Sequence, residues 1–502
     1  MAITNPGGLL NTVPAPQMQT LDSNYLDFTT GGSGVNDFAQ QYLPDLMAQE
    51  AEVFGPRTIS GFLAQVGAEE PMSSDQVVWS EQSRLHISVK GTIVTTGETN
   101  GTFEVTSDID GNNASSSPVF TLANHGVRVN DIVLISNPGT TTKCKVVDAD
   151  TAIIQVEPYG ATDLSAHTGT LTGATLLVVG SEYGKGVSYY AESDGSTVKD
   201  YRQANEPTFK SFTNKPIIMK DYYEVSGSDT AKIGWVEVSV EDGTSGYLWY
   251  LKAEAETRLR FADYMEMAMI EAEKTHADSA IGNYHGATDL GADGAGTEGL
   301  FKAISTRGNV TSGVTGVNAA TDLAEFDAIL AEFDSQGAIE ENMMFVNRAT
   351  ALAMDDMLAS MNSYGAGGTS YGVFQNSEDM ALNLGFSGFR RGSYDFYKSD
   401  WRYLNDKATR GGINATAGSS AVRGAIIPAG TSTVYDQMLG KNLKRPFLHV
   451  RFRASQTDNR YFKTWVTGSV GAATSALDAM QIHMLTERCL ITQGANNFML
   501  MQ

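Results

Sequence analysis

The sequence predicts an α+β protein, because three stretches of the chain differ sharply in pattern. The run from Trp249 to Lys274 contains neither Gly nor Pro, as a long helix requires. Residues 93–180 carry short β-type runs separated by Gly, Asn, Asp, Ser or Pro about every ten residues, which is typical of a small β-sandwich or barrel. Residues 296–440 alternate between helical and strand-like patterns, which indicates a separate α+β domain.

Composition excludes several classes of protein. The chain has 502 residues and a formal net charge of -23, so tight binding of nucleic acid through its phosphates is not its expected role. Its two cysteines, Cys144 and Cys489, form no disulfide framework and favour a reducing compartment. The first residues lack the basic and apolar regions of a signal peptide, and no apolar run reaches the length of a membrane span.

The first half of the chain divides into an arm, a helical segment and a hairpin. Residues 1–36 are rich in Pro, Gly, Asn, Ser and Thr and are predicted to form an extended arm. A leading helical segment follows at 37–75. Two strand-like stretches, 76–92 and 181–212, are predicted to be the arms of a long hairpin, and the β-domain at 93–180 is inserted between them.

The second half of the chain is built around the long helix. Residues 213–295 and 441–502 are predicted to form one domain, with a helix at about 245–275. Apolar residues recur at helical steps, so one stripe should face a core; its members are Leu248, Leu251, Ala255, Leu259, Ala262, Met265 or Glu266, and Met269. A helix of about 28 residues spans about 40 Å and can act as a beam. Residues 296–440 contain helices at 321–337 and 349–361, and one more helix is predicted at 473–480.

The strongest enzymatic motif is weak. Residues 368–372 read Gly-Thr-Ser-Tyr-Gly and satisfy G-x-S-x-G, so Ser370 with His449 or His483 would define a Ser hydrolase. The motif needs a buried strand before it, whereas residues 362–367 form a Gly-rich lead-in. A Gly-rich loop explains the pattern better, and the sequence predicts no enzyme.

Metal and cofactor sites have little support. Residues 108–112 read Asp-Ile-Asp-Gly-Asn and resemble half of a calcium loop, but no closing Glu follows at the required spacing. A tight β-turn explains the pair Asp110-Gly111 equally well. Neither cysteine has a C-x-x-C partner and the seven histidines are scattered, so zinc is not expected. No phosphate-binding motif occurs, and no cofactor is predicted.

One basic stretch, residues 439–465, contrasts with the acidic chain as a whole. It could touch nucleic acid with interleaved aromatic residues, or pair with the acidic excess of a neighbouring copy. The sign of the chain favours an inter-subunit contact. Aromatic residues of the hairpin are candidate anchors for the same purpose, although packing within the hairpin explains them equally well. The candidate interface residues are Trp79, Arg84, Tyr189, Tyr190, Lys441, Lys444, Arg445, Arg451 and Arg453.

An arm and a projecting hairpin expose backbone and apolar surface that only a neighbour can cover. The sequence therefore predicts a protein that works as many identical copies.

This order of parts resembles the major capsid protein of tailed bacteriophages, the Hong Kong-type coat fold. The resemblance is carried by the arm at 1–36, the leading helix, the hairpin that opens with VVWSEQSRLH, the strands KPIIMKDYYEVSG and KIGWVEV, and the helix SGYLWYLKAEAETRLRFADYMEMAMIEAEK. The stretch from KDYYEVSG to SGYLWYLKAE is similar to coat proteins of the crAss-like gut phages. In this family these parts would be the N-arm, the E-loop, the peripheral domain and the spine helix, with 296–440 as the axial domain.

The resemblance implies a coat protein that self-assembles as hexamers and pentamers into an icosahedral shell around phage DNA. Its implied partners are identical subunits, portal and auxiliary capsid proteins, and packaged double-stranded DNA that it does not bind by sequence. Its implied location is the virion, after assembly in the bacterial cytoplasm. The alternatives are the Ser hydrolase and another virion component, such as a tail or adhesin protein.

Overall fold

The protein is described by a computed structural model over residues 62–63, 68–82, 84–111, 125–150, 152–185, 209–232, 238–239, 245–246, 248–275, 296–337, 339–361, 388–429, 431–436 and 441–502. These residues fall into two compact units. One lies within Val78–Phe212, and the other lies within Met1–Val77 and Thr213–Gln502. The first unit begins and ends close to the limits, 76 and 212, of the predicted hairpin with its inserted domain.

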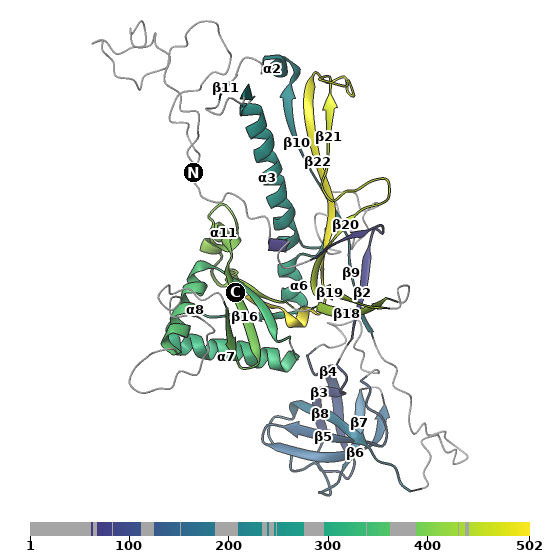
Figure 1. The fold of residues 1–502 in the computed structure, drawn as a ribbon. Helices are drawn as coiled ribbons and strands as arrows, with labels where there is room; N and C mark the ends of the chain where they lie inside the picture. The colour runs from purple at the N-terminus through teal and green to yellow at the C-terminus, as the bar shows by residue number, and fades with distance from the viewer. Residues whose placement is uncertain are drawn as a thin grey trace. The chain divides into compact units, whose positions relative to one another are not determined.

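The smaller unit contains a closed six-stranded barrel in the strand order β3-β4-β7-β6-β5-β8 (Figure 1). Every neighbouring pair is antiparallel. A two-stranded ribbon of β2 and β9 completes the unit. The strands are β2 (Val77–Gln82), β3 (Ser88–Thr95), β4 (Gly101–Asp108), β5 (Asp131–Asn137), β6 (Thr140–Asp150), β7 (Ile153–Pro158), β8 (Thr172–Ser181) and β9 (Phe209–Asn214).

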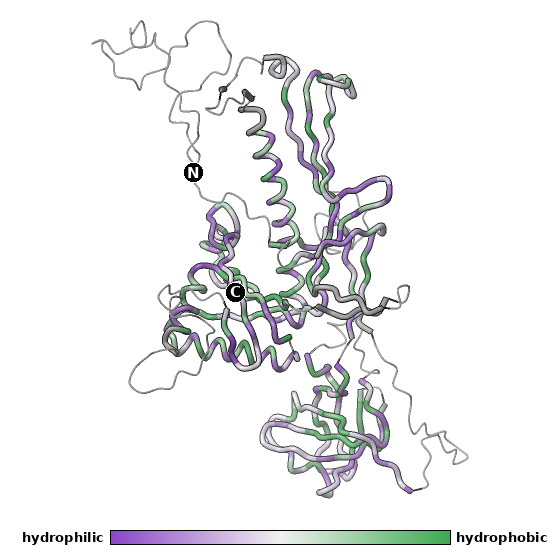
Figure 2. The backbone as a smooth tube through the Cα atoms, in the orientation of Figure 1, coloured by the Kyte–Doolittle hydropathy of each residue, from purple (hydrophilic) through white to green (hydrophobic). Residues whose placement is uncertain are grey.

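Alternation of inward-facing and outward-facing side chains characterises the barrel strands. Along β5 every second residue from Asp131 to Asn137 is buried, because successive side chains of a strand point to opposite faces. Figure 2 shows both hydrophobic and hydrophilic residues along the barrel strands. The barrel begins at Ser88, earlier than residue 93 of the prediction, because Val89 and Ile93 point into its core. The single strand predicted across 76–94 is therefore two strands, β2 and β3.

A polar group is enclosed within the barrel. His167 is 3% exposed, and its Nδ1 lies 2.6 Å from Asn137 Oδ1 while its Nε2 lies 2.9 Å from Thr142 Oγ1. Burial lowers the pKa of the His167 imidazole, because the charged form loses its hydration. The folded barrel therefore favours the neutral imidazole, which is hydrogen-bonded at both ring nitrogens.

The larger unit contains a sheet around one long central strand. The strand β22 (Ala479–Thr492) pairs on one side with β10 (Ile217–Ser226) and on the other with β21 (Lys463–Gly468) and β20 (Leu448–Arg453). The strand β1 (Ala68–Met72) lies parallel to β20 at the edge of this sheet. A leading segment predicted to be helical up to residue 75 therefore ends in a strand, and of its earlier part the structure describes only Phe62 and Leu63, which are helical.

The predicted long helix is present as α3 (Leu248–Glu271), which packs along β10 and β22 (Figure 1). The face that it buries agrees with the predicted stripe at Met265 and Met269 and differs from it at Phe261, which is buried, and Leu259, which is exposed. Phe261, Met265 and Met269 are buried, one helical turn apart, and Phe261 contacts the ring of Phe462 at 5.6 Å. Leu259 is 46% exposed, because the position of the sheet decides which apolar stripe is covered.

A second sheet of the larger unit has the order β13-β23-β17-β14-β16-β15. Its central strands bury side chains on both faces, as in β14, where Phe345 joins one core and Met344 and Val346 join another. The strands are β13 (Asn309–Thr311), β14 (Glu341–Val346), β15 (Gly388–Arg391), β16 (Tyr394–Asp400), β17 (Gly424–Pro428) and β23 (Met499–Met501).

Helices cover the Met344 face of this sheet. Both predicted helices are confirmed, as α7 (Ala319–Gln336) and α8 (Arg348–Met361). The α7 helix starts at Asn318, whose side chain accepts a hydrogen bond from Thr321 N, and it ends at Gly337 with φ 65°, the left-handed cap that glycine favours. Phe326 and Phe333 of α7 are fully buried there.

The Phe345 face contributes to a core that joins the two sheets. It gathers Met269 and Ile270 from the end of α3, Leu448 and Leu490 from the first sheet, and Phe345 from the second. Phe62 stacks on Trp401 at 4.4 Å between ring centroids. The remaining elements are α2 (Gly227–Lys232), α6 (Leu300–Arg307), α10 (Arg402–Asn405), α11 (Arg410–Ala417), two short 3-10 turns at Gly418–Ser420 and Ala495–Asn497, and the strand pairs β11 (Val238–Ser239) with β12 (Ser245–Gly246) and β18 (Thr431–Asp436) with β19 (Lys441–Pro446).

The helix predicted at 473–480 is wrong. Residues 471–478 form an exposed connection and β22 begins at Ala479. Gly468 and Gly471 have positive φ angles, which build a turn rather than a helix. Met480 then pairs with Val225 of β10 and Gly468 of β21.

We predict that Phe345→Ala destabilises the larger unit by about 3–5 kcal/mol, because it removes a buried ring from the core that joins both sheets. Tyr397→Ala, on the neighbouring strand β16 but 52% exposed, should change stability by less than about 0.5 kcal/mol. Denaturant unfolding of the full chain followed by circular dichroism measures both variants. Equal unfolding midpoints would contradict this account of the core.

We predict that the barrel loses stability as the pH falls. The unfolded chain binds a proton at His167 below a pH of about 6.5, whereas the folded barrel disfavours that proton. The free energy of unfolding therefore has its full value above pH of about 6.5 and decreases below it. Scanning calorimetry of the full chain across this range should show a smaller decrease for His167→Gln, and an identical pH dependence in both proteins would contradict the assignment.

Candidate subunit-contact surface

The candidate hairpin residues have partners inside the chain. Trp79 is 7% exposed, its ring lies 6.1 Å from that of Phe212, and its Nε1 donates to Glu81 Oε1 at 2.9 Å. Arg84 forms an ion pair with Asp110, with Nη2 2.9 Å from Oδ1. Trp79 thus packs within the ribbon, which was the alternative interpretation of this residue. Tyr189 and Tyr190 lie outside the described residues.

The first part of the basic stretch lies on a separate two-stranded ribbon. Lys441, Lys444 and Arg445 belong to β19, where they pair in register with Asp436, Thr433 and Ser432 of β18. A two-stranded ribbon has two edges without a strand partner, and such edges are sites where another chain can pair. The sequence prediction of a subunit contact at these three residues remains a prediction.

The second part of the basic stretch binds the segment that follows Phe62 and Leu63. Arg451 Nη2 lies 2.7 Å from Glu70 Oε2, and Arg453 pairs with Asp75. Arg488, on the neighbouring strand β22, lies 4.0 Å from Glu69. Three arginines of the sheet therefore face three carboxylates of residues 69–75, and these ion pairs add to the parallel strand pairing that places β1 beside β20.

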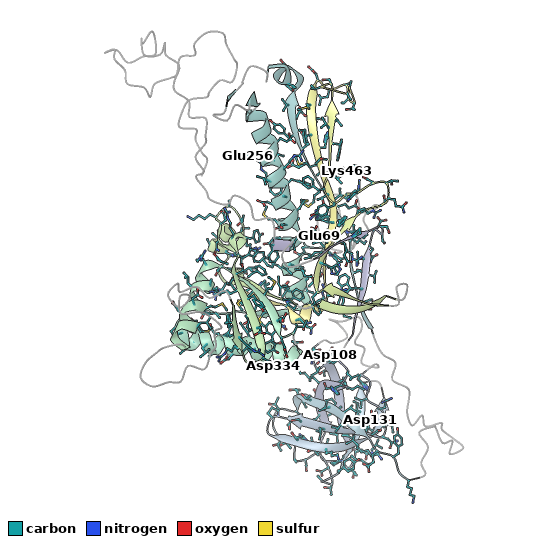
Figure 3. The ribbon with its side chains drawn as sticks, viewed as in Figure 1. Glu69, Asp108, Asp131, Glu256, Asp334 and Lys463 are labelled. Atoms are coloured by element: carbon teal, nitrogen blue, oxygen red, sulfur yellow. The ribbon has the colours of Figure 1, made fainter. Side chains whose placement is uncertain are left out.

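Further charges extend this arrangement along the sheet. Glu487 accepts from Arg460 and lies 3.9 Å from Arg453, and Asp458 accepts from Lys463 at 2.7 Å. Figure 3 shows Glu69 and Lys463 among the side chains of this sheet. Charges of opposite sign alternate from Asp75 to Lys463, so much of the basic stretch is neutralised inside the chain.

Arg488 is the most buried member of this set, with 4% exposure. It donates to Thr486 Oγ1 and to the carbonyl of Tyr461, both at 2.9 Å, and its guanidinium lies 5.0 Å above the Tyr461 ring. Burial lowers the pKa of Arg488, and Tyr461 and Glu69 oppose this effect. The sequence signal for this residue was weak, because Arg488 lies in an apolar run that looks like an ordinary buried strand.

The residues proposed for a Ser hydrolase are not brought together by anything that the structure describes. Ser370 and its loop lie outside the described residues. His449 is 1% exposed on β20, where its Nε2 accepts a weak 3.5 Å contact from Arg451. His483 stacks between Trp465 and Tyr222, at 5.1 and 6.0 Å between ring centroids, so both histidines have structural surroundings.

The candidate ion sites also have structural roles. Gly111 has a φ of 88° and its N–H donates to Asp108 O at 3.1 Å, which is the predicted tight turn, and Asp110 is held by Arg84. Among the described residues no group of three or more His, Cys, Asp or Glu side chains is placed to hold a metal ion.

Burial raises the pKa of Cys144 and of Cys489 to about 12, so neither thiol is an activated nucleophile. In the part of the chain that is described, no helix is long and apolar enough to cross a membrane.

Two polar junctions were missed by sequence reasoning. Asn214, which is 1% exposed, donates to the carbonyls of Leu490 and Glu298 at 2.6 and 3.1 Å, and its Oδ1 accepts from Glu298 N at 2.9 Å. Glu271, at the end of α3, accepts from Tyr403 and Arg410, both at 2.8 Å. Their partners are far away in the sequence, so no local pattern identifies them.

Comparison with known proteins gives only distant similarity. No family model matches the chain, and no curated protein matches it. Similar solved structures include Mycobacterium phage Ogopogo (11% identity, TM-score 0.40, covering 93% of this chain and 99% of that chain). They also include Microbacterium phage Oxtober96 (10%, 0.36, 91% and 96%) and the mature capsid of bacteriophage PhiM1 (8%, 0.35, 95% and 98%). These structures come from bacteriophages, and at such identities and TM-scores they do not establish the fold or function of this chain.

We predict a small coupling between Glu70 and Arg451. A double-mutant cycle with Glu70→Gln and Arg451→Gln should give an interaction energy of about 0.5–1 kcal/mol, because both side chains retain partial exposure, 27% and 18%, and are screened by solvent. The coupling should decrease with added salt. The longer pair Arg390–Asp395, at 3.6 Å and 62% and 35% exposed, is the control and should show almost none. Equal coupling in both pairs would contradict the assigned role of Arg451.

Proposed function

We propose that the chain is the major capsid protein of a tailed bacteriophage with a Hong Kong-type coat fold. In this proposal the copies form hexamers and pentamers of an icosahedral shell around the phage DNA. Supporting it are the order of parts along the sequence and one structural observation. The 24-residue helix α3 lies along the strands β10 and β22 and enters, at its C-terminal end, the core shared by both sheets.

A helix held in this way resists bending. Its middle is fixed by Phe261 and Met265 against Met484, and its end is fixed by Met269, Ile270 and Glu271. In a shell, such a beam would keep a fixed spacing between contacts made at its two ends. A coat subunit needs this property, because its curvature must be reproduced in every copy.

Electrostatics support the same role. A net charge of -23 disfavours tight binding to packaged DNA, so the DNA can leave the shell. Within the proposal, Tyr189, Tyr190, Lys441, Lys444 and Arg445 are contacts to neighbouring copies. The portal and auxiliary proteins are further partners, and the subunits assemble in the bacterial cytoplasm before they become part of the virion. A relationship to the crAss-like phages is part of the same proposal.

Electron microscopy of the purified full chain tests this function. We expect closed shells, or hexameric and pentameric rings, at high protein concentration. Tubes or fibres would instead indicate a tail component. Discrete monomers that react with a fluorophosphonate, and lose this reaction in Ser370→Ala, would indicate a hydrolase, whereas in the coat protein Ser370→Ala should assemble like the wild type.

A further inference from the structure

The barrel carries an aliphatic surface that its own fold does not need. Val179 is 59% exposed and Leu177 is 38% exposed on the outward side of β8. Leu177 pairs in register with Leu134 of β5, whose outward side chain is half-buried. Leu85, just before the barrel, is 90% exposed. We call Leu85, Ile132, Leu134, Leu177 and Val179 the β5–β8 patch.

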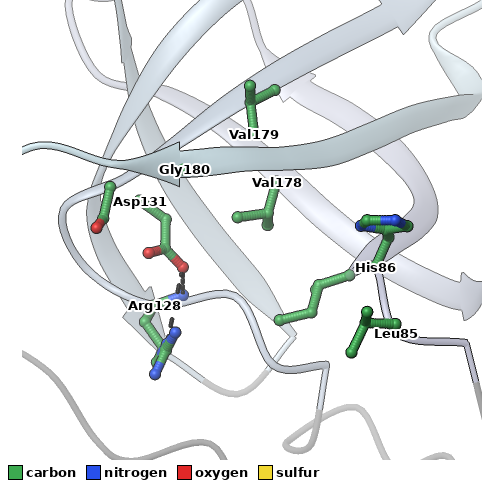
Figure 4. A pocket seen from close by; sticks show the side chains of 9 residues that line it. Leu85, His86, Arg128, Asp131, Val178, Val179 and Gly180 are labelled. Carbon is green, nitrogen blue, oxygen red and sulfur yellow. Dashed lines mark hydrogen bonds and ion pairs between the residues drawn. The ribbon is translucent and has the colours of Figure 1, made fainter.

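Two residues of the patch, Leu85 and Val179, line the same hollow. It is also lined by His86, Ile87, Arg128 and Asp131 (Figure 4). The N–H of Val178 donates to Ile87 O at 3.0 Å, which holds the segment of Leu85 beside β8. The strands β5 and β8 thus present a preformed aliphatic face with a hollow at one end that Leu85 also lines, and a preformed surface loses little conformational entropy when it binds.

Charges of both signs lie around the patch. Lys143 and Lys145 of β6 pair in register with Leu134 and Ile132 of β5. Lys145 also pairs in register with Glu157 of β7. Lys143 lies 5.1 Å above the ring of Tyr159, whose hydroxyl bonds Glu182. Arg128 faces Asp131 at the edge of the hollow. Charges of both signs therefore border the patch: the cations Lys90, Arg128, Lys143 and Lys145 and the carboxylates Glu157 and Glu182, whereas Asp131 is buried.

These surface charges favour a second copy of the chain as the occupant. Two copies of a chain with a net charge of -23 repel each other wherever acidic surfaces meet. A surface with an aliphatic centre and charges of both signs can contact a second copy without that repulsion, and opposite charges can pair across the contact. We infer that the β5–β8 patch binds a second copy of this chain, an inference that rests on the proposed capsid function.

The test compares self-assembly of full-length variants with equal changes on two sides of the barrel. Val179→Asp and Leu177→Asp alter the patch. Ile153→Asp alters a similarly exposed residue (49%) on β7, the strand farthest from β8 in the closed order. Light scattering measures the protein concentration at which assemblies form. We expect this concentration to rise at least about tenfold for the patch variants and to change less than about twofold for Ile153→Asp.

A second pair of variants avoids damage to the barrel. Lys143→Gln and Gln155→Glu each make the chain more acidic by one charge, the first beside the patch and the second on β7. Only Lys143→Gln should raise the assembly concentration, and calorimetry should show the same unfolding of the barrel in both proteins.

The outcomes separate this inference from the proposed function. If the wild type assembles and the patch variants behave like their β7 controls, the inference is overturned while the capsid proposal stands. If the wild type stays monomeric at every concentration, both are overturned.

Discussion

The structure of the larger unit depends on the packing of α3 against two different sets of residues. Along its middle the helix contacts the first sheet through Phe261 and Met265. At its C-terminal end Met269 and Ile270 enter a core that also contains Phe345 of the second sheet and Leu490 of β22. The carboxylate of Glu271 would be unfavourable at a helix C-terminus, but Tyr403 and Arg410 bind it. One helix therefore ties both sheets into one body.

The distribution of charge follows from the same architecture. The chain has 58 acidic and 35 basic side chains, and many of the described basic groups near the first sheet are bound to carboxylates of their own chain. Arg451 and Arg453 hold residues 70–75 against β20, so these cations fix the leading segment rather than attract nucleic acid. A surface with unbalanced negative charge then remains, and this is compatible with a protein that surrounds DNA without holding it.

The sequence predicted the presence of helices and strands better than it predicted which side of a helix is buried or which distant residues are in contact. The Gly- and Pro-free run predicted α3, and the apolar steps from Leu323 to Phe333 with Gly337 at the end predicted α7, because helix period and capping are local signals. The barrel followed from turn residues between short β-type runs. The buried face of α3 was predicted only in part: Met265 and Met269 are buried as expected. Leu259 and Phe261 are equally apolar, and only the position of β10 and β22 selects between them.

Contacts between residues far apart in the sequence could not be predicted from local sequence patterns. The pairs Arg451–Glu70 and Asn214–Leu490 join residues hundreds of positions apart, and the ring of Trp79 lies near that of Phe212, 133 positions later. The helix expected at 473–480 failed because its alanines were read without the turn glycines before them. For the pairs, a partner distant in sequence determined the contact, whereas the failed helix reflects a local turn signal that was missed.

The central claim, that α3 and both sheets form one mechanical body, is tested most directly by native-state hydrogen exchange of the full chain. The amides from Phe261 to Ile270 should open with the same free energy, and the same dependence on denaturant, as those of β14 and β22, because one core holds them all. If these helix amides exchange through a separate opening of much lower free energy while both sheets stay protected, the helix is an appendage and not a beam, and the account is contradicted.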